Sequence, residues 1–186
     1  MERPRQYENA AYVLDGQVQN PVFKPRQRFQ GSVAHVVGEN YFTLLEVLLD
    51  ARAKVQPLSR VIVAKAGRRE INFVFGRISF AELSGVAKTE LQPAIQKIVW
   101  VREKYFVNFF NTAPPISSRM HSLEVLPGFG KKHRTTILNM RDRKPFESFD
   151  DFRLRTGIAD PIGIITKRIL DELAKKQPHI LFTRRD

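Results

Sequence analysis

The sequence predicts an α+β protein of two domains: an N-terminal small β-barrel, a long connecting helix and a C-terminal all-α domain. Short β-branched and aromatic runs separated by polar turns occupy residues 10–86. Residues 87–113 instead repeat apolar side chains every three or four positions. Residues 114–186 alternate short helical patterns with glycine- and proline-containing turns, and they are the most basic part of the chain per residue.

The N-terminal part is predicted to form several short strands. Residues 1–9 are expected to be a polar, disordered lead-in. The turn-prone Gly38-Glu39-Asn40 predicts a hairpin between the runs on either side of it, and the prolines of residues 19–30 predict an irregular or edge segment. A small barrel or a strongly bent sheet accommodates strands this short and this close together. The expected strands lie at 10–15, 30–37, 41–50, 61–64 and 71–76.

The helical pattern of residues 87–113 predicts the connection between the domains. Ser79 with Glu82 three residues later predicts a capping box just before it, and Pro93 either starts a helix or kinks one. Helical spacing favours packing in the core over base stacking for the aromatic residues of this segment. Ala113 and the two following prolines end the pattern, which places the domain boundary there. The aromatic residues are Trp100, Tyr105, Phe106, Phe109 and Phe110.

Composition narrows the classes of function. The chain has no cysteine, which excludes disulfides, Cys-ligated metals and thiol catalysis, and its four histidines have no metal-ligand spacing. It has neither a long apolar run nor a signal peptide, so we expect a cytoplasmic protein with no membrane partner. The net charge of +12 attracts polyanions and makes nucleic acid the leading partner. The alternative is an ordinary Lys- and Arg-rich surface.

The stretch LPGFGKK, residues 126–132, is the strongest local signal. Ser117 or Ser118 is expected to cap a short helix ending near Val125, and a second helix resumes at Lys131. Gly128 and Gly130 permit positive φ and allow a neighbouring group to approach the backbone closely. Because the first amides of a helix lack internal partners and lie at the positive end of its dipole, the turn predicts a phosphate site.

LPGFGKK, with ILNMR and RKPFESFDDF after it, resembles the tandem helix-hairpin-helix module. The resemblance implies a hairpin that grips a phosphate backbone without reading sequence, and a monovalent cation on the carbonyls of Leu126 and Gly128. It also implies that Ser148 caps the first helix of the second pair. Phe146, Phe149 and Phe152 should then lie in the core. The predicted contacts with nucleic acid at this hairpin are Gly128, Phe129, Gly130, Lys131, Lys132, His133 and Arg134.

The chain departs from that module in two places. Arg134 stands where the module usually has a small residue, so either the helices pack less closely or the guanidinium extends outward. In the second hairpin Gly157-Ile158-Ala159 replaces the glycine pair, and Asp160-Pro161 follows. We therefore expect the second hairpin to be mainly structural. A plain glycine-capped helix connection, or a hairpin that binds protein, is the alternative for the first.

Nearly the whole chain is similar to an archaeal family known as domain of unknown function 655. The similarity rests on YFTLLEV, the AKTEL helix, FVNFFNTAPPI, the R-x-H-x-L-E pattern of residues 119–124 and LPGFGKK. It implies the OB-like barrel and the helix-hairpin-helix domain, and proximity to translation and transcription genes. On the barrel, Arg68 and Arg69 are the predicted contacts for nucleic acid. Arg26, Arg28, Arg52 and Lys54 are the other nearby charges.

We therefore expect a non-enzymatic nucleic-acid-binding protein without a cofactor, with RNA slightly favoured over DNA. Its rival is a ribosome or transcription accessory factor whose hairpin contacts protein. A remote alternative is a DNA glycosylase or lyase, because Lys132 and Asp150 have the spacing of a Schiff-base lysine and its aspartate in such enzymes. The setting ESFDDF and the absence of a many-helix domain argue against that activity.

Overall fold

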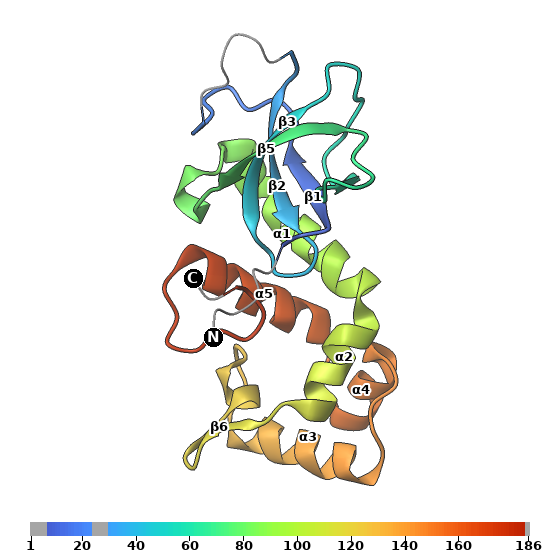
Figure 1. Ribbon diagram of the computed structural model, residues 1–186. Coiled ribbons are helices and arrows are strands. Elements are labelled where there is room, and N and C mark those ends of the chain that lie inside the picture. The colour runs from blue at the N-terminus through green and yellow to red at the C-terminus, as the bar shows by residue number, and fades with distance from the viewer. Residues whose placement is uncertain (1–6, 24–29, 185–186) are drawn as a thin grey trace, which may run out of the picture. The chain divides into compact units, whose positions relative to one another are not determined.

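The computed structural model describes residues 7–23 and 30–184. It is an α+β structure with a five-stranded sheet and five α-helices in these residues. The chain divides into two compact units, and the division falls between Ala94 and Ile95, inside α1 (Gly85–Val101) (Figure 1). Residues 182–184 belong with the first unit. The sequence places its domain boundaries after residues 86 and 113 instead.

The first unit is built on a curled, all-antiparallel sheet (Figure 1), whose strand order is β4-β1-β2-β3-β5. The predicted hairpin across residues 38–40 is confirmed, since β2 pairs with β3 from Val33 opposite Leu48 to Val37 opposite Leu44. Every residue of β1, β2 and β3 is buried, as expected for uninterrupted apolar runs. The strands are β1 (Ala10–Asp15), β2 (Val33–Gly38), β3 (Leu44–Leu49), β4 (Arg60–Ile62) and β5 (Ile71–Arg77).

The predicted small barrel is a half-barrel in the structure, and strand direction explains why it stays open. β1 and β3 both run antiparallel to β2, so β4 and β5, their outer neighbours, run in the same direction as each other. Closing the barrel would require parallel pairing, which needs a crossover of about a dozen residues or more. Residues 63–70 are too short for such a crossover. We call the gap between β4 and β5 the seam.

A buried polar network ties α1 to this sheet. The His35 imidazole lies 3.1 Å from the Glu46 carboxylate, and both side chains are fully buried. Its other ring nitrogen accepts the Ser84 backbone N–H at 3.2 Å. Glu46 also accepts the backbone N–H groups of Val22 and Phe23, so each oxygen of this carboxylate has a partner. The network fixes the start of α1 against strands β2 and β3.

The predicted disordered lead-in needs correction at its end. Residues 1–6 lie outside the described residues, but residues 7–9 are described. The Glu8 carboxylate is buried and accepts backbone N–H groups of Asn40, Tyr41 and Thr43 at 2.9–3.1 Å. Glu8 therefore holds the β2–β3 turn, because its carboxylate satisfies three amides that the turn leaves unpaired.

The single long connecting helix predicted for residues 87–113 is also wrong. The structure has two helices there, α1 and α2 (Glu103–Thr112), separated at Arg102, whose ψ of 31° is not helical. The Arg102 guanidinium lies 4.4 Å from the ring centre of Tyr105. Pro93 lies inside α1 and does not end it. The capping box of Ser79 and Glu82 is present, but it starts the short 3₁₀ turn η1 (Phe80–Glu82).

Two of the five aromatic residues predicted to lie in the core are exposed. Trp100 and Tyr105 are on the surface, whereas Phe106 and Phe110 are fully buried. Phe110 stacks on Phe152, with ring centres 4.1 Å apart. Phe146 and Phe149 are buried too, which confirms the predicted aromatic core of this region.

Short helices make up most of the second unit. Ser148 caps α4 by accepting the Asp151 N–H at 3.0 Å, as predicted. The predicted cap at Ser117 or Ser118 is wrong, because those residues lie in and beside a two-stranded ribbon and His121 caps the next turn. After α2 the elements are β6 (Pro115–Ser117), β7 (Met120–His121), the 3₁₀ turn η2 (Ser122–Val125), α3 (Lys131–Arg143), α4 (Phe149–Thr156) and α5 (Pro161–Ala174).

Two arginines link these elements through carbonyls. Arg155 of α4 donates to the Met140 and Lys144 carbonyls at 2.6 and 2.7 Å, which satisfies acceptors at the end of α3. Arg168 of α5 is buried, pairs with Glu172 at 2.8 Å and donates to the carbonyls of Val125 and His179. In the described part of the chain, no helix has the length and apolar character needed to cross a membrane.

Candidate nucleic-acid interface

The turn between η2 and α3 has one glycine with a backbone that other residues rarely adopt. Gly128 has φ of 77°, in the left-handed region that favours glycine. Gly130, in contrast, has φ −127° and ψ −169°, an extended conformation open to any residue. A Cβ at either position would meet nothing within 4 Å. The fold therefore requires a glycine at 128 for its conformation, but it does not require one at 130.

The first turn of α3 begins at Gly130 and is open. Gly130 is the N-cap and has no side chain with which to cap the helix amides. The first helical hydrogen bond runs from Arg134 N–H to the Gly130 carbonyl at 3.0 Å, so the amides of residues 131–133 precede it. Lys131 and Lys132 are exposed at this helix start. Unpaired amides, the helix dipole and two ammonium groups thus coincide at one place.

Phe129 and His133 support the turn rather than present their rings on its surface. The Phe129 side chain is buried, with 9% exposure, and the His133 ring stacks on it with centres 5.1 Å apart. Among the predicted contacts, Phe129 can therefore offer backbone but little of its ring. The stack holds the first turn of α3 against the glycine turn.

Arg134 is held from the side of η2. Its guanidinium lies 3.4 Å from both carboxylate oxygens of Glu124, and the two side chains are mostly buried. The Arg134 guanidinium thus lies against η2, paired with the Glu124 carboxylate. Pairing with Glu124 makes Arg134 a weaker phosphate contact than the two lysines.

His121 and Glu124 form a capping box at the start of η2. His121 Nδ1 accepts the Leu123 N–H at 3.1 Å, and Glu124 accepts the His121 N–H at 2.9 Å. The pKa of Glu124 is lowered chiefly by that backbone hydrogen bond, which outweighs its partial burial, with help from Arg134. Burial first, and then the positive charges of Arg141 and Arg134, lower the pKa of His121. The folded protein therefore favours a neutral His121.

This pKa shift predicts a pH dependence of stability. The unfolded chain binds a proton on His121 more readily than the folded protein does. The contribution of neutral His121 to the free energy of unfolding is therefore complete above the ordinary pKa of 6.5, and it is lost as the pH falls below that value. Asn at 121 keeps an acceptor for the Leu123 N–H but does not titrate. We expect the free energy of unfolding, measured in urea at pH 7.5 and 5.5, to fall less in His121→Asn than in the wild type. Equal falls would contradict the assignment. Glu124 does not interfere, because its ordinary pKa of 4.5 lies below this window.

The turn between α4 and α5 is closed by its own side chain. Gly157 ends α4 with φ of 74°. Asp160 is the N-cap of α5, and its carboxylate accepts the Gly163 N–H at 2.8 Å. Pro161 follows at the first helical position, where its missing N–H removes one donor. An acidic cap occupies the place that an external anion would take, in contrast to the open start of α3.

Two further predictions from the sequence concern this unit. The Leu126 carbonyl, expected with that of Gly128 to hold a monovalent cation, accepts the Phe129 N–H at 3.0 Å and keeps one lone pair. Asp150, which would partner Lys132 in lyase chemistry, is 91% exposed and lies 3.3 Å from Arg153. The Asp150 carboxylate is thus solvated and paired on the surface of α4.

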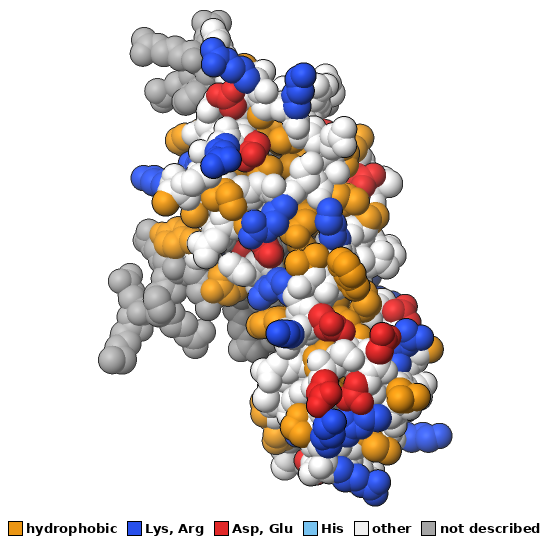
Figure 2. Space-filling view, turned by 90° about the vertical axis from the view of Figure 1, so that its right-hand side faces the viewer, with side chains coloured by type: hydrophobic (Ala, Val, Ile, Leu, Met, Phe, Trp, Pro, Cys, Tyr) orange, Lys and Arg blue, Asp and Glu red, His pale blue; other side chains and the backbone are white. Residues whose placement is uncertain are grey.

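The predicted contacts of the half-barrel occupy different settings. Arg68 donates from Nε to the Val63 carbonyl at 2.6 Å and is half-buried, whereas Arg69, Arg52 and Lys54 are exposed. Arg26 and Arg28 lie outside the described residues. On the face shown in Figure 2, Lys and Arg side chains are scattered with acidic ones among them. The distribution of charge therefore does not locate an interface on this face. Local geometry is needed to locate it.

Comparisons with known proteins place the chain in a family. Residues 7–184 match the family described as "Protein of unknown function (DUF655)". The chain is 36% identical over 184 residues to "Uncharacterized protein MJ0038" of Methanocaldococcus jannaschii, covering 98% of this chain and 82% of that one. The crystal structure of Af1531 from Archaeoglobus fulgidus, which represents DUF655, superposes with a TM-score of 0.84 at 38% identity and covers 95% of this chain and all of the other. The chain therefore belongs to the DUF655 family, as its sequence pattern had suggested, and both relatives come from archaea.

Proposed function

We propose that this protein binds nucleic acid through the phosphate backbone, without reading base sequence, and that the turn at residues 126–132 is its main contact. One observation carries the proposal. Gly130 leaves the backbone bare at the start of α3, although neither its φ nor any neighbouring atom requires a glycine there. A group outside the chain that approaches the backbone closely accounts for it.

The chemistry of this turn matches a phosphate. The amides of residues 131–133 can donate to phosphate oxygens, and the helix dipole favours a negative charge at the same place. Lys131 and Lys132 add two full charges that need no particular orientation. Amides and ammonium groups of this kind bind phosphates and carry no base information themselves. The interface is therefore a backbone contact.

The assignments of a helix-hairpin-helix to the second unit and of an OB-like fold to the half-barrel belong to the same proposal. Two helix pairs, η2 with α3 and α4 with α5, are joined by turns at Gly128 and Gly157, and this arrangement supports the assignment of a tandem helix-hairpin-helix. Asp160 caps the second pair, so we assign the contact to the first pair alone. We also propose that the half-barrel provides an OB-like surface that contacts the backbone of the nucleic acid. RNA is slightly favoured over DNA, because the resemblance to this family implies a gene that lies near translation and transcription genes.

Fluorescence anisotropy tests the proposal directly. The full chain is titrated against single- and double-stranded RNA and DNA of equal length at 50 and 200 mM salt. We expect binding to naked strands of unrelated sequences with similar affinity, and a loss of affinity at the higher salt because counterions are released. Absence of binding to every naked strand would refute the proposal and favour the accessory factor whose turn contacts protein.

A further inference from the structure

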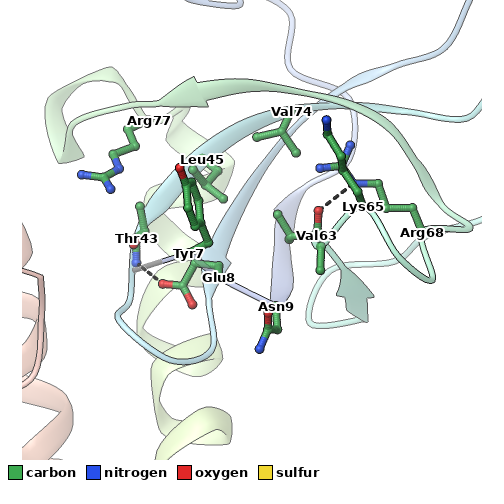
Figure 3. Close-up of a pocket in the computed structure, with 11 residues that line it drawn as sticks. Tyr7, Glu8, Asn9, Thr43, Leu45, Val63, Lys65, Arg68, Val74 and Arg77 are labelled. Carbon is green, nitrogen blue, oxygen red and sulfur yellow. Dashed lines mark hydrogen bonds between the residues drawn. The ribbon is translucent and has the colours of Figure 1, made fainter. Parts of the chain in front are cut away.

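The open seam of the half-barrel contains a cavity of about 500 Å³, shown in Figure 3. It exists because β4 and β5 run in the same direction and do not pair. Residues that follow β4, residues of β3 and β5, and residues of the chain before β1 surround it. Its size lies within the range of small-molecule sites. The lining residues that matter below are Tyr7, Glu8, Leu45, Val63, Lys65, Arg68, Val74 and Arg77.

The floor of the cavity is apolar and one wall is aromatic. Leu45, Val63 and Val74 pack against or belong to the core of the half-barrel. Tyr7 is 67% exposed, and Figure 3 shows its ring beside Leu45. The ring therefore contributes little to the core, yet it forms a flat surface at the cavity. A planar apolar group could lie on such a surface.

The rim is cationic. Figure 3 shows Lys65 and Arg68 on one side of the cavity and Arg77 on the opposite side. Glu8 is the acidic residue of the lining, and its carboxylate is directed to the backbone amides of the β2–β3 turn. The Arg68 guanidinium is positioned by its hydrogen bond to the Val63 carbonyl. On the Lys65 and Arg68 side, the lining thus carries two cations, while the one carboxylate of the lining is already bonded.

We propose that this cavity binds a single nucleotide, with the base on the apolar floor beside Tyr7 and the phosphate on Lys65 and Arg68. A nucleotide combines the planar ring and the anion that the two parts of the cavity separately suit. A simple acidic peptide would satisfy the cations but leave the apolar floor and Tyr7 without a partner. The proposal concerns the first unit alone, so it does not depend on the turn before α3 binding anything.

Calorimetric titration of the full chain tests this site. Adenosine and uridine 5′-monophosphates are the probes, with adenosine and inorganic phosphate as half-ligands and a 5′-phosphorylated hexanucleotide RNA as a strand. We expect saturable binding of both monophosphates, about tenfold tighter than either half-ligand. Tyr7→Ala removes the stacking surface and should weaken binding about tenfold. Arg68→Gln removes a charged donor and should do the same.

Arg119→Gln is the matched control, because it removes the same charge from an exposed arginine that does not line the cavity. It should change nucleotide affinity less than twofold. Arg68→Gln also removes the hydrogen bond to the Val63 carbonyl, so it could weaken binding by destabilising the fold. Tyr7→Ala does not share this problem, because the Tyr7 side chain is exposed. Equal losses from the Arg68 and Arg119 variants, or no saturable binding of the monophosphates, would overturn the proposal.

The same titrations separate this site from the turn before α3. Replacing Lys131 and Lys132 with alanine should leave the affinity for monophosphates unchanged, whatever it does to strands. Loss of monophosphate binding in that variant would refute the cavity. A hexanucleotide that depends on Tyr7 and binds more tightly than the monophosphates identifies the nucleotide as part of a strand, whereas dependence seen with monophosphates alone identifies a free nucleotide.

Discussion

Replacing both Lys131 and Lys132 with alanine is expected to weaken binding to duplex DNA about 30-fold at about 0.15 M salt. Each lost phosphate contact should flatten the slope of log affinity against log salt by about 0.9. Two lost contacts change the slope by about 1.8, which weakens affinity about 30-fold at about 0.15 M salt relative to a reference of 1 M. The loss should be similar for every sequence, because the proposed partners of the two lysines are phosphates, which carry no base information. Both side chains are exposed at the start of α3, so the fold should be unaffected. Anisotropy titrations at four salt concentrations measure the slope.

The matched control replaces Lys175 and Lys176 with alanine. This exposed pair follows α5, and its removal changes the net charge by the same amount. If affinity depends only on overall charge, both double variants will lose it equally and the turn before α3 will have no special role. If neither changes affinity while changes at Arg68 and Arg69 abolish it, the half-barrel is the interface.

Gly130→Val is expected to weaken binding about tenfold or more while leaving the fold intact. The branched side chain projects into open space at the point where the phosphate would approach, and it blocks donors that charge-assisted hydrogen bonds need. Its φ of −127° suits valine, so the free energy of unfolding should change by no more than about 1 kcal/mol, the cost of a poorer N-cap. Urea unfolding and anisotropy measure the two quantities.

Gly128→Val is its counterpart. At φ of 77° a residue with a Cβ should lose about 1–2 kcal/mol of stability or more, because the left-handed conformation is strained. The two variants therefore separate a glycine that the fold needs from one that it does not. Unchanged strand affinity in a folded Gly130→Val protein would show that nothing approaches the backbone there.

Features with a local cause were predictable from the sequence. The β2–β3 hairpin follows from its turn residues, the Ser148 cap from its spacing to Asp151, and the open start of α3 from Gly130 and the lysines. These patterns work because each depends on residues within a few positions of one another.

Features decided by distant partners were not predictable. No glycine or proline marks the break at Arg102 between α1 and α2, and the polar Glu8 gave no sign that it would satisfy a turn more than thirty residues away. Arg134 finds Glu124 only because η2 and α3 fold against each other. The cavity was not predictable for a similar reason, because Tyr7 and Lys65 line one cavity only as a result of the strand directions.

The unpaired strands of the seam bear on how the protein behaves at high concentration. An exposed strand edge invites pairing with another chain, and charged side chains, short strands and bulges discourage it. β4 has three residues, β5 has register shifts against β3, and Lys65, Arg68 and Arg77 surround the gap. Mutual repulsion of these cations opposes edge-to-edge aggregation of two copies. An unclosed barrel can thus remain dispersed in solution without a partner strand to complete it.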